Sequence, residues 1–186
     1  MQSWGNPCIA VTGTILTRIE IIFFAVYIKL YYYDGRLCDI VRMSKLLLVT
    51  SVIFYVIYDV ISTLAAFNYL GSFEYEKSML IKFAFDLAGI PGFIGVKVAL
   101  SMIAILIAYS LIQRYEKFRG FGKGVLAGAT LSGLFVGTSN FNIVLNGSSI
   151  WLMGMDSGTI AAVIILGCSF AGYVSTRRGY GMASAE

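Results

Sequence analysis

The sequence predicts an all-α polytopic integral membrane bundle, and three observations lead to this fold class. The 186-residue chain is 58% hydrophobic and only 13% charged, whereas roughly a quarter of the residues of a soluble domain are charged. Its apolar residues form blocks of about twenty, the length a helix needs to cross a bilayer. Its basic residues gather between the blocks, as in membrane proteins. We therefore expect a single transmembrane domain, residues 1–186, of five or four spans plus one interfacial amphipathic helix.

The first block, residues 14–33, is the weakest of the five expected spans. It contains Arg18, Glu20 and Lys29. Long basic side chains near helix ends can extend to the membrane surface, and the tyrosines at 31–33 suit an interfacial aromatic belt. The alternative is a helix that lies along the surface. In that case four spans remain.

The second span is expected at residues 46–70, with Asp59 near its middle. An interfacial helix is expected at 73–89, because apolar residues recur there at helical spacing between charged ones. Its apolar residues are Phe73, Met79, Leu80, Phe83 and Leu87. Pro91 ends this helix and opens the third and clearest span, residues 91–113, whose one charged residue is Lys97.

The last two spans, residues 124–145 and 150–174, are joined by a tight turn and are rich in small residues. Small residues four apart allow helix backbones to approach closely in membranes. The candidate helix-packing positions are Gly124, Gly128, Gly133, Gly137, Gly154 and Gly158. We expect these two spans to pack against each other or against a neighbouring subunit.

The basic residues predict the orientation of the chain. With the N-terminus outside and the C-terminus in the cytoplasm, nine of the fourteen Lys and Arg residues are cytoplasmic, and the outer loops hold only Lys77 and Lys82. The nine are Arg36, Arg42, Lys45, Arg114, Lys117, Arg119, Lys123, Arg177 and Arg178. This bias follows the positive-inside rule, and the membrane is expected to be a prokaryotic plasma membrane. The net charge of +4 thus indicates topology, and no nucleic-acid partner is expected.

The composition excludes several kinds of chemistry. The chain has no histidine, which removes most zinc sites, His-ligated haem and His general-base catalysis. The cysteines Cys8, Cys38 and Cys168 are far apart and have no metal-ligand spacing. We therefore expect no metal, no cofactor and no catalytic residues in this chain.

The most informative pattern is a set of polar residues inside the expected spans. When depth is counted from the outer ends at ~1.5 Å per residue, most of them lie roughly 6–9 Å deep and Asp59 about 15 Å deep. The set is Arg18, Glu20, Asp59, Lys97, Asn142 and Asp156. Charges inside a membrane normally face the bundle interior and form pairs.

In this expected cluster, Lys97 meets Asp59 or Asp156, and Arg18 meets Glu20 or Asp156. Ser62 and Thr63 follow Asp59 on the same helical face, and Asn140 lies beside Asn142. Such a cluster serves either as an ion, proton or polar-substrate site or as buried ion pairs that fix helix register or contact another subunit.

Part of this pattern resembles a family of small prokaryotic, often archaeal, helical membrane proteins. The resemblance covers residues 46–146 and rests on Asp59, Ser62-Thr63, Glu74, Glu76, Lys97 and Asn142. The family has an Asp-x-x-x-Thr helix, a Glu-x-Asn-Pro-like loop and a lysine-bearing helix. This chain lacks the Asn-Pro and has Glu76-Lys77-Ser78 in that neighbourhood. The resemblance implies a fold and no activity.

Two classes of function are open. The first is a non-catalytic accessory subunit that packs with other integral-membrane subunits, for example in a respiratory or oxidoreductase assembly with redox centres on other chains. The second is a small oligomeric transporter or channel that uses the polar cluster around Asp59 and Lys97. Polar faces turned into the bundle, around a water-filled cavity, favour transport, whereas small-residue faces turned outward favour a subunit. The lipid bilayer is a partner in either case.

Overall fold

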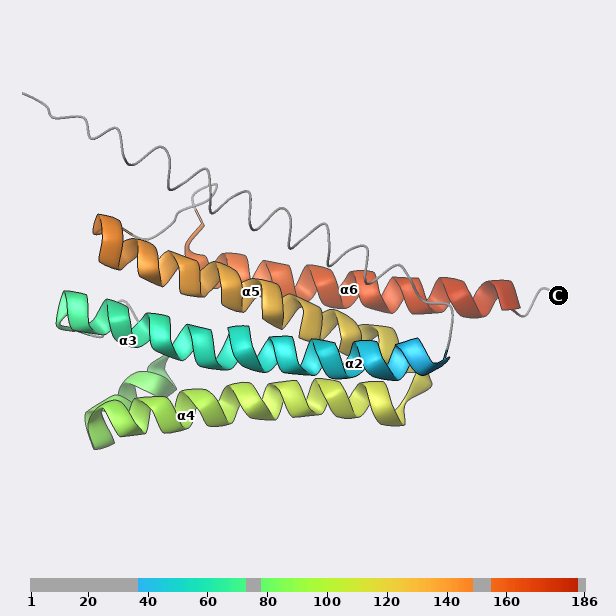
Figure 1. Cartoon of the computed structure of the whole chain (residues 1–186), viewed down its shortest axis with the longest axis horizontal. Helices are drawn as coiled ribbons and strands as arrows, with labels where there is room; N and C mark the ends of the chain where they lie inside the picture. The colour runs from blue at the N-terminus through green and yellow to red at the C-terminus, as the bar shows by residue number, and fades with distance from the viewer. Residues whose placement is uncertain (1–36, 73–77, 149–154, 184–186) are drawn as a thin grey trace, which may run out of the picture. The chain divides into compact units, whose positions relative to one another are not determined.

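The computed structural model describes residues 37–72, 78–148 and 155–183, with side chains from Met43 to Thr176 within these ranges. The chain forms two compact units, Met1–Met43 and Ser44–Glu186, and the packing below is that of the second. The elements are α2 (Leu37–Ser51), the π-helix η1 (Val52–Tyr58), α3 (Asp59–Leu70), α4 (Met79–Arg114), the 3₁₀ helix η2 (Glu116–Phe118), α5 (Arg119–Asn146) and α6 (Ser157–Ala183) (Figure 1). The described chain is thus all-helical, as expected.

Three segments of the described chain are long and apolar enough to cross a membrane. They are Met43–Leu70, Met79–Arg114 and Ser157–Thr176. Each of them overlaps one of the expected spans at 46–70, 91–113 and 150–174. The expected span at 14–33 lies outside the described residues, so the predicted total of five is not supported.

The expected span at 124–145 forms a helix, α5, but is not one of these three. It has 28 residues, or about 42 Å at ~1.5 Å per residue, so its length is sufficient. Its Gly, Ser, Thr and Asn residues lower its hydropathy. The fold explains this composition, because α5 packs against α6, α4, α3 and η1 and needs small side chains more than apolar ones.

The glycines of α5 make close contacts on two sides of the helix. A Cβ atom added to Gly128 would lie 2.7 Å from the Cα of Ile165 in α6, and one added to Gly133 would lie 2.6 Å from the Cα of Tyr55 in η1. Gly124 likewise faces α6, and Gly137 faces the ring of Tyr58. The small residues of α5 therefore bring helices of the same chain together.

The small residues expected at the start of the last span behave differently. Gly154 lies outside the described residues. Gly158 follows the turn that precedes α6, and the nearest atom to an added Cβ there is an oxygen of Asp156, 3.2 Å away. Gly158 thus contributes to the start of the helix and not to a helix–helix contact in the described chain.

Helix α4 consists of two helical segments that meet at Gly89. Gly89 has φ 63° and ψ −149°, a backbone conformation that is essentially restricted to glycine. Pro91 stands in the first turn of the second segment, where its missing N–H has no helical acceptor to lose. Figure 1 shows the ribbon turning sharply near the start of α4. The helix expected at 73–89 is therefore a short segment, residues 79–88, that begins after the N-cap Ser78, and residues 73–77 lie outside the described residues. Its place at a membrane interface stays a prediction.

The backbone conformation at Gly89 tolerates no side chain without strain. Gly89→Ala destabilises the protein by about 1–3 kcal/mol, because the new side chain forces a non-glycine residue into this strained conformation. Nothing lies within 4 Å of the added Cβ, so the cost is conformational and not steric. The measurement is thermal unfolding in mild detergent.

Gly95→Ala is the matched control for this prediction. Gly95 lies in the helical part of α4, and its added Cβ also meets nothing within 4 Å. Alanine there stabilises the helix by up to about 1 kcal/mol. Equal melting temperatures for the two variants would contradict the role assigned to Gly89.

Candidate functional site

A buried group of polar side chains lies where α3, α4 and α5 meet, and it is the candidate site. The Nζ atom of Lys97 in α4 lies 3.0 Å from Oδ2 of Asp59 and 2.8 Å from Oγ1 of Thr63, both in α3. The amide of Asn140 in α5 donates to the hydroxyls of Ser62 and Thr63, at 3.2 Å each. We call these five residues the Asp59–Lys97 cluster.

The two hydroxyl groups of the cluster have a defined orientation. Thr63 Oγ1 donates to the main-chain oxygen of Asp59 at 2.7 Å, and Ser62 Oγ donates to the same oxygen at 3.0 Å. A hydroxyl has one proton and two lone pairs. With the protons committed to this carbonyl, the lone pairs of Thr63 accept from Lys97 and Asn140. The cluster thus presents oxygen lone pairs and a carboxylate to a cation.

The ion pair is well shielded by its surroundings. The Lys97 and Asp59 side chains are only 11% and 12% exposed, and Ser62 and Thr63 are buried. Nζ of Lys97 also lies 5.4 Å from the centre of the Phe93 ring, within the distance of a cation–π interaction. Charges held in such a low-dielectric environment interact strongly, and a change in either one has a large effect on the other.

The short segment of α4 helps to position this site. Ile81 and Phe93 form a buried apolar group, with Leu64, Phe67 and Phe85 packed against it. The bend at Gly89 folds residues 79–88 back so that Ile81 can reach Phe93. Because Phe93 and Lys97 are one turn apart on α4, this packing supports the ring beneath the ammonium group.

A π-helix lies directly before Asp59. Helix η1 (Val52–Tyr58) continues directly into α3, and the backbone stays helical at Tyr58 and Asp59. A π-helix has i→i+5 hydrogen bonds and is frequent at functional sites. It also changes the register, so side chains of α3 do not lie where α-helical periodicity counted from α2 would put them. Gly133 of α5 lies against the backbone of Phe54 and Tyr55, which brings α5 close to this segment.

The other expected members of the cluster have different positions. Asp156 lies in the turn before α6 and caps it, since its Oδ1 accepts from the backbone N–H groups of Gly158 and Thr159 at 3.0 and 3.1 Å. The expectation that Asp156 lies about six residues inside a span is therefore wrong, because the helix begins only at Ser157. A carboxylate at a helix N-terminus satisfies free N–H groups there.

Asn142 also lies apart from the ion pair. Its amide donates to the main-chain oxygen of Ser148 at 2.7 Å, and its Oδ1 accepts from Asn146 at 2.5 Å. Asn142 thus closes the C-terminal end of α5. Arg18 and Glu20 lie outside the described residues, so their expected pairing stays a prediction.

The spacing of residues along α5 indicates that Asn140 lies on the packing face of the helix, which a count of depth from the helix end does not show. Gly133, Gly137 and Asn140 are spaced i, i+4, i+7, which places them on one face of a helix. The two glycines face η1 and Asn140 faces α3. A second polar contact, also missed, lies on the same helix: Ser51 Oγ is 2.9 Å from the carbonyl oxygen of Leu126 and 3.3 Å from Thr130 Oγ1.

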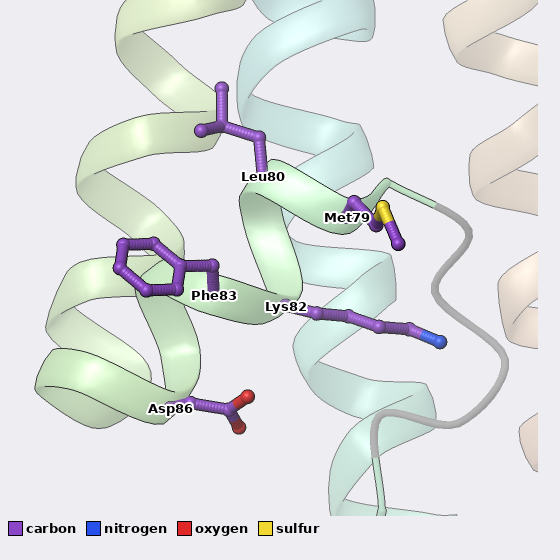
Figure 2. A pocket seen from close by; sticks show the side chains of 5 residues that line it. All are labelled: Met79, Leu80, Lys82, Phe83 and Asp86. Atoms are coloured by element: carbon purple, nitrogen blue, oxygen red, sulfur yellow. The ribbon is translucent and has the colours of Figure 1, made fainter.

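An open hollow lies on the short segment of α4, away from the cluster. It is lined by Met79, Leu80, Lys82, Phe83 and Asp86. Figure 2 shows Lys82 and Asp86 extending from the same side of this segment. Met79 is 89% exposed and Phe83 63% exposed. This surface combines apolar side chains with one basic and one acidic residue, which is typical of a helix at a membrane interface.

These features define a class: an all-helical membrane protein with a buried Asp–Lys ion pair between its helices. Among the residues described, no group of three or more His, Cys, Asp or Glu side chains is arranged to hold a metal ion. No family model, curated protein or solved structure matches the chain.

Proposed function

We propose that this protein is a small oligomeric membrane transporter or channel whose ion or proton site is the Asp59–Lys97 cluster. The observation that carries the proposal is the ion pair, 3.0 Å long and almost fully shielded, which joins two segments that are each apolar enough to span a bilayer. Placing charge there costs at least ~2.5–3.5 kcal/mol per residue on insertion scales, and intramembrane charges commonly mark ion or proton pathways.

The packing of α5 supports transport over the accessory-subunit alternative. The small-residue faces that favoured a subunit contact α6 and η1 within this chain, so they do not supply a surface for another protein. The side chains of Asp59 and Lys97, in contrast, are directed into the bundle.

A non-catalytic subunit of a larger membrane complex is the second candidate. It is favoured by the apolar surface of two spans, because only 11% of the most apolar window of Met79–Arg114 and 22% of that of Ser157–Thr176 are buried. Either lipid or other membrane helices would cover these faces. Copurification of stoichiometric, different membrane proteins in mild detergent would favour the subunit, whereas a lone homo-oligomer would favour the transporter.

We further propose the topology in which α5 crosses the membrane beside the three apolar spans and residues 14–33 form the fifth span. The N-terminus is then outside, the C-terminus is cytoplasmic, and the membrane is a prokaryotic plasma membrane. Residues 79–88 would lie at the outer interface, with the exposed Met79, Phe83 and Leu87 in contact with lipid.

The function is tested by ion and proton flux in liposomes that contain the purified protein. We expect flux above that of empty liposomes for the wild type and a loss of at least tenfold for Asp59→Asn. Asp156→Asn is the matched control, because Asp156 is also a carboxylate but lies outside the cluster, and it is expected to keep the wild-type rate. Equal rates for the two variants would overturn the proposed site.

A further inference from the structure

We infer that the π-helix η1 is a conformational switch, which separates Asp59 from Lys97 when it converts to an α-helix. This inference rests on the proposed transport function and adds how its site opens. Helix η1 lies within Met43–Leu70, a segment apolar enough to span a bilayer, and Asp59 is the first residue after it. A change in η1 therefore acts directly on the carboxylate of the cluster.

The two forms of η1 differ in register. A π-helix forms its hydrogen bonds between residues five apart, whereas an α-helix forms them between residues four apart. A turn of π-helix thus holds an additional residue, and its conversion to an α-helix shifts the residues that follow by one position. With 3.6 residues per turn, one position corresponds to a rotation of about 100°. On a helix about 10–12 Å across, this rotation moves a side chain by up to about 8 Å.

The α2 side of η1 is anchored to α5, so the rotation falls on α3. Ser51, the residue before η1, is fully buried. Its Oγ lies 2.9 Å from the carbonyl oxygen of Leu126 and 3.3 Å from Thr130 Oγ1, both in α5. Beyond η1, α3 is joined to α4 and α5 by the Asp59–Lys97 cluster. Rotation of α3 breaks these contacts and leaves those of Ser51 in place.

The cluster stabilises η1 in its π form. The ion pair of 3.0 Å and the hydrogen bonds from Asn140 to the hydroxyls of α3 are made in the π register, and the rotated α3 lacks them. A π-helix is rare and occurs mostly as a single turn, so its persistence depends on such contacts. An equilibrium between two forms shifts with any contact that only one of them makes. Loss of the ion pair therefore shifts η1 toward the α-helix.

The sequence of η1 brings the two forms closer in free energy. Four of its residues, Val52, Ile53, Val56 and Ile57, are β-branched. Side chains of this kind lower the stability of an α-helix, because they lose rotamer freedom against the preceding turn. The α form therefore gains less over the π form here than it does in a segment of good helix formers.

The contacts of η1 are of a kind that permits rotation. Gly133 and Gly137 of α5 face η1, and at these positions α5 presents no side chain that interlocks with the turns of its neighbour. On the outward side, Ile53, Ile57 and Ile61 are about half exposed, so lipid can accommodate their movement. Helix α3 can thus turn without the displacement of α5.

The experiment measures the distance between two spin labels in the full chain, reconstituted in liposomes, with its own cysteines replaced by alanine. Asn68→Cys carries one label on α3, beyond η1, and Leu166→Cys carries the other on α6, both at exposed positions. With the cluster intact we expect one main distance. Asp59→Leu combined with Lys97→Met lacks the ion pair and is expected to stay folded. In this double variant we expect a second distance that differs by up to about 8 Å.

Two controls show whether the change comes from η1. A label at Leu46→Cys in α2, before η1, should keep an unchanged distance to the label at Leu166→Cys. Deletion of Ile57 removes one residue from the π-helix at a half-exposed position, so that η1 becomes an α-helix while α3 keeps its present orientation. Added to the double variant, this deletion should abolish the second distance.

The outcomes separate this inference from the proposed function. A single unchanged distance in the double variant would overturn the switch, and so would a second distance that persists after deletion of Ile57. In the chain with an intact cluster, deletion of Ile57 should lower flux at least tenfold, and flux at the wild-type rate would also overturn the switch. A second distance in the double variant without any flux in the wild type would support the switch and overturn transport.

Discussion

Lys97→Met lowers the free energy of unfolding by about 3–5 kcal/mol, because it leaves a carboxylate in the protein interior without its ion-pair partner. Asp59 and Lys97 are both nearly inaccessible, at 12% and 11% side-chain exposure. The loss also removes the contact of Nζ with Thr63 Oγ1. Thermal unfolding in mild detergent measures the effect, and a lower fraction of correctly assembled protein accompanies it.

A double variant distinguishes loss of the pair from loss of the lysine side chain. Lys97→Met combined with Asp59→Leu removes both charges, and such replacements of a buried pair are often neutral or stabilising. We expect the double variant to recover most of the stability that the single variant loses. A double variant as unstable as the sum of the two single ones would show that the two residues are not coupled.

Gly133→Leu is also expected to destabilise the protein. A Cβ atom at Gly133 would lie 2.5 Å from the main-chain oxygen of Phe54 and 2.6 Å from the Cα of Tyr55, so the obstacle is backbone that cannot rotate away. Overpacking of this kind costs about 1–3 kcal/mol and occasionally more. The separation of α5 from η1 also weakens the hydrogen bonds of Asn140 to α3.

Gly167→Leu is the control for this substitution. Gly167 lies in α6, and nothing lies within 4 Å of its added Cβ, so a larger side chain has room there. Leucine is a better helix former than glycine by roughly 1 kcal/mol or less, and the melting temperature is expected to stay level or rise. A similar loss in both variants would show that the close approach at Gly133 is not what stabilises the bundle.

Lys97→Met and Gly133→Leu change the same region of the bundle. Gly133 lets α5 approach the π-helix η1, and two turns further along α5 Asn140 reaches the hydroxyls of α3. The site and the close helix packing therefore depend on each other. Gly133→Leu should reduce flux in liposomes along with stability, whereas Gly167→Leu should lower neither.

The class of this protein and the composition of its helices follow from the amino-acid sequence alone. Blocks of about twenty apolar residues are expected in a membrane or a buried core. Within a membrane, the backbone polar groups of such a block find hydrogen-bond partners when the block forms a helix. The sequence also indicated that Lys97 needs an acidic partner, since an unpaired charge in hydrocarbon is costly. It left Asp59 and Asp156 as equal candidates.

The tertiary structure decided between these candidates and completed the site. Asp156 caps α6 instead, because a helix begins where its first N–H groups find acceptors and not where hydropathy begins. The π-helix before Asp59 changes the register of α3, which counting at 3.6 residues per turn does not detect. Asn140 rather than Asn142 joins the cluster. Gly133 and Gly137 allow one face of α5 to approach η1 closely, and Asn140 lies on that face.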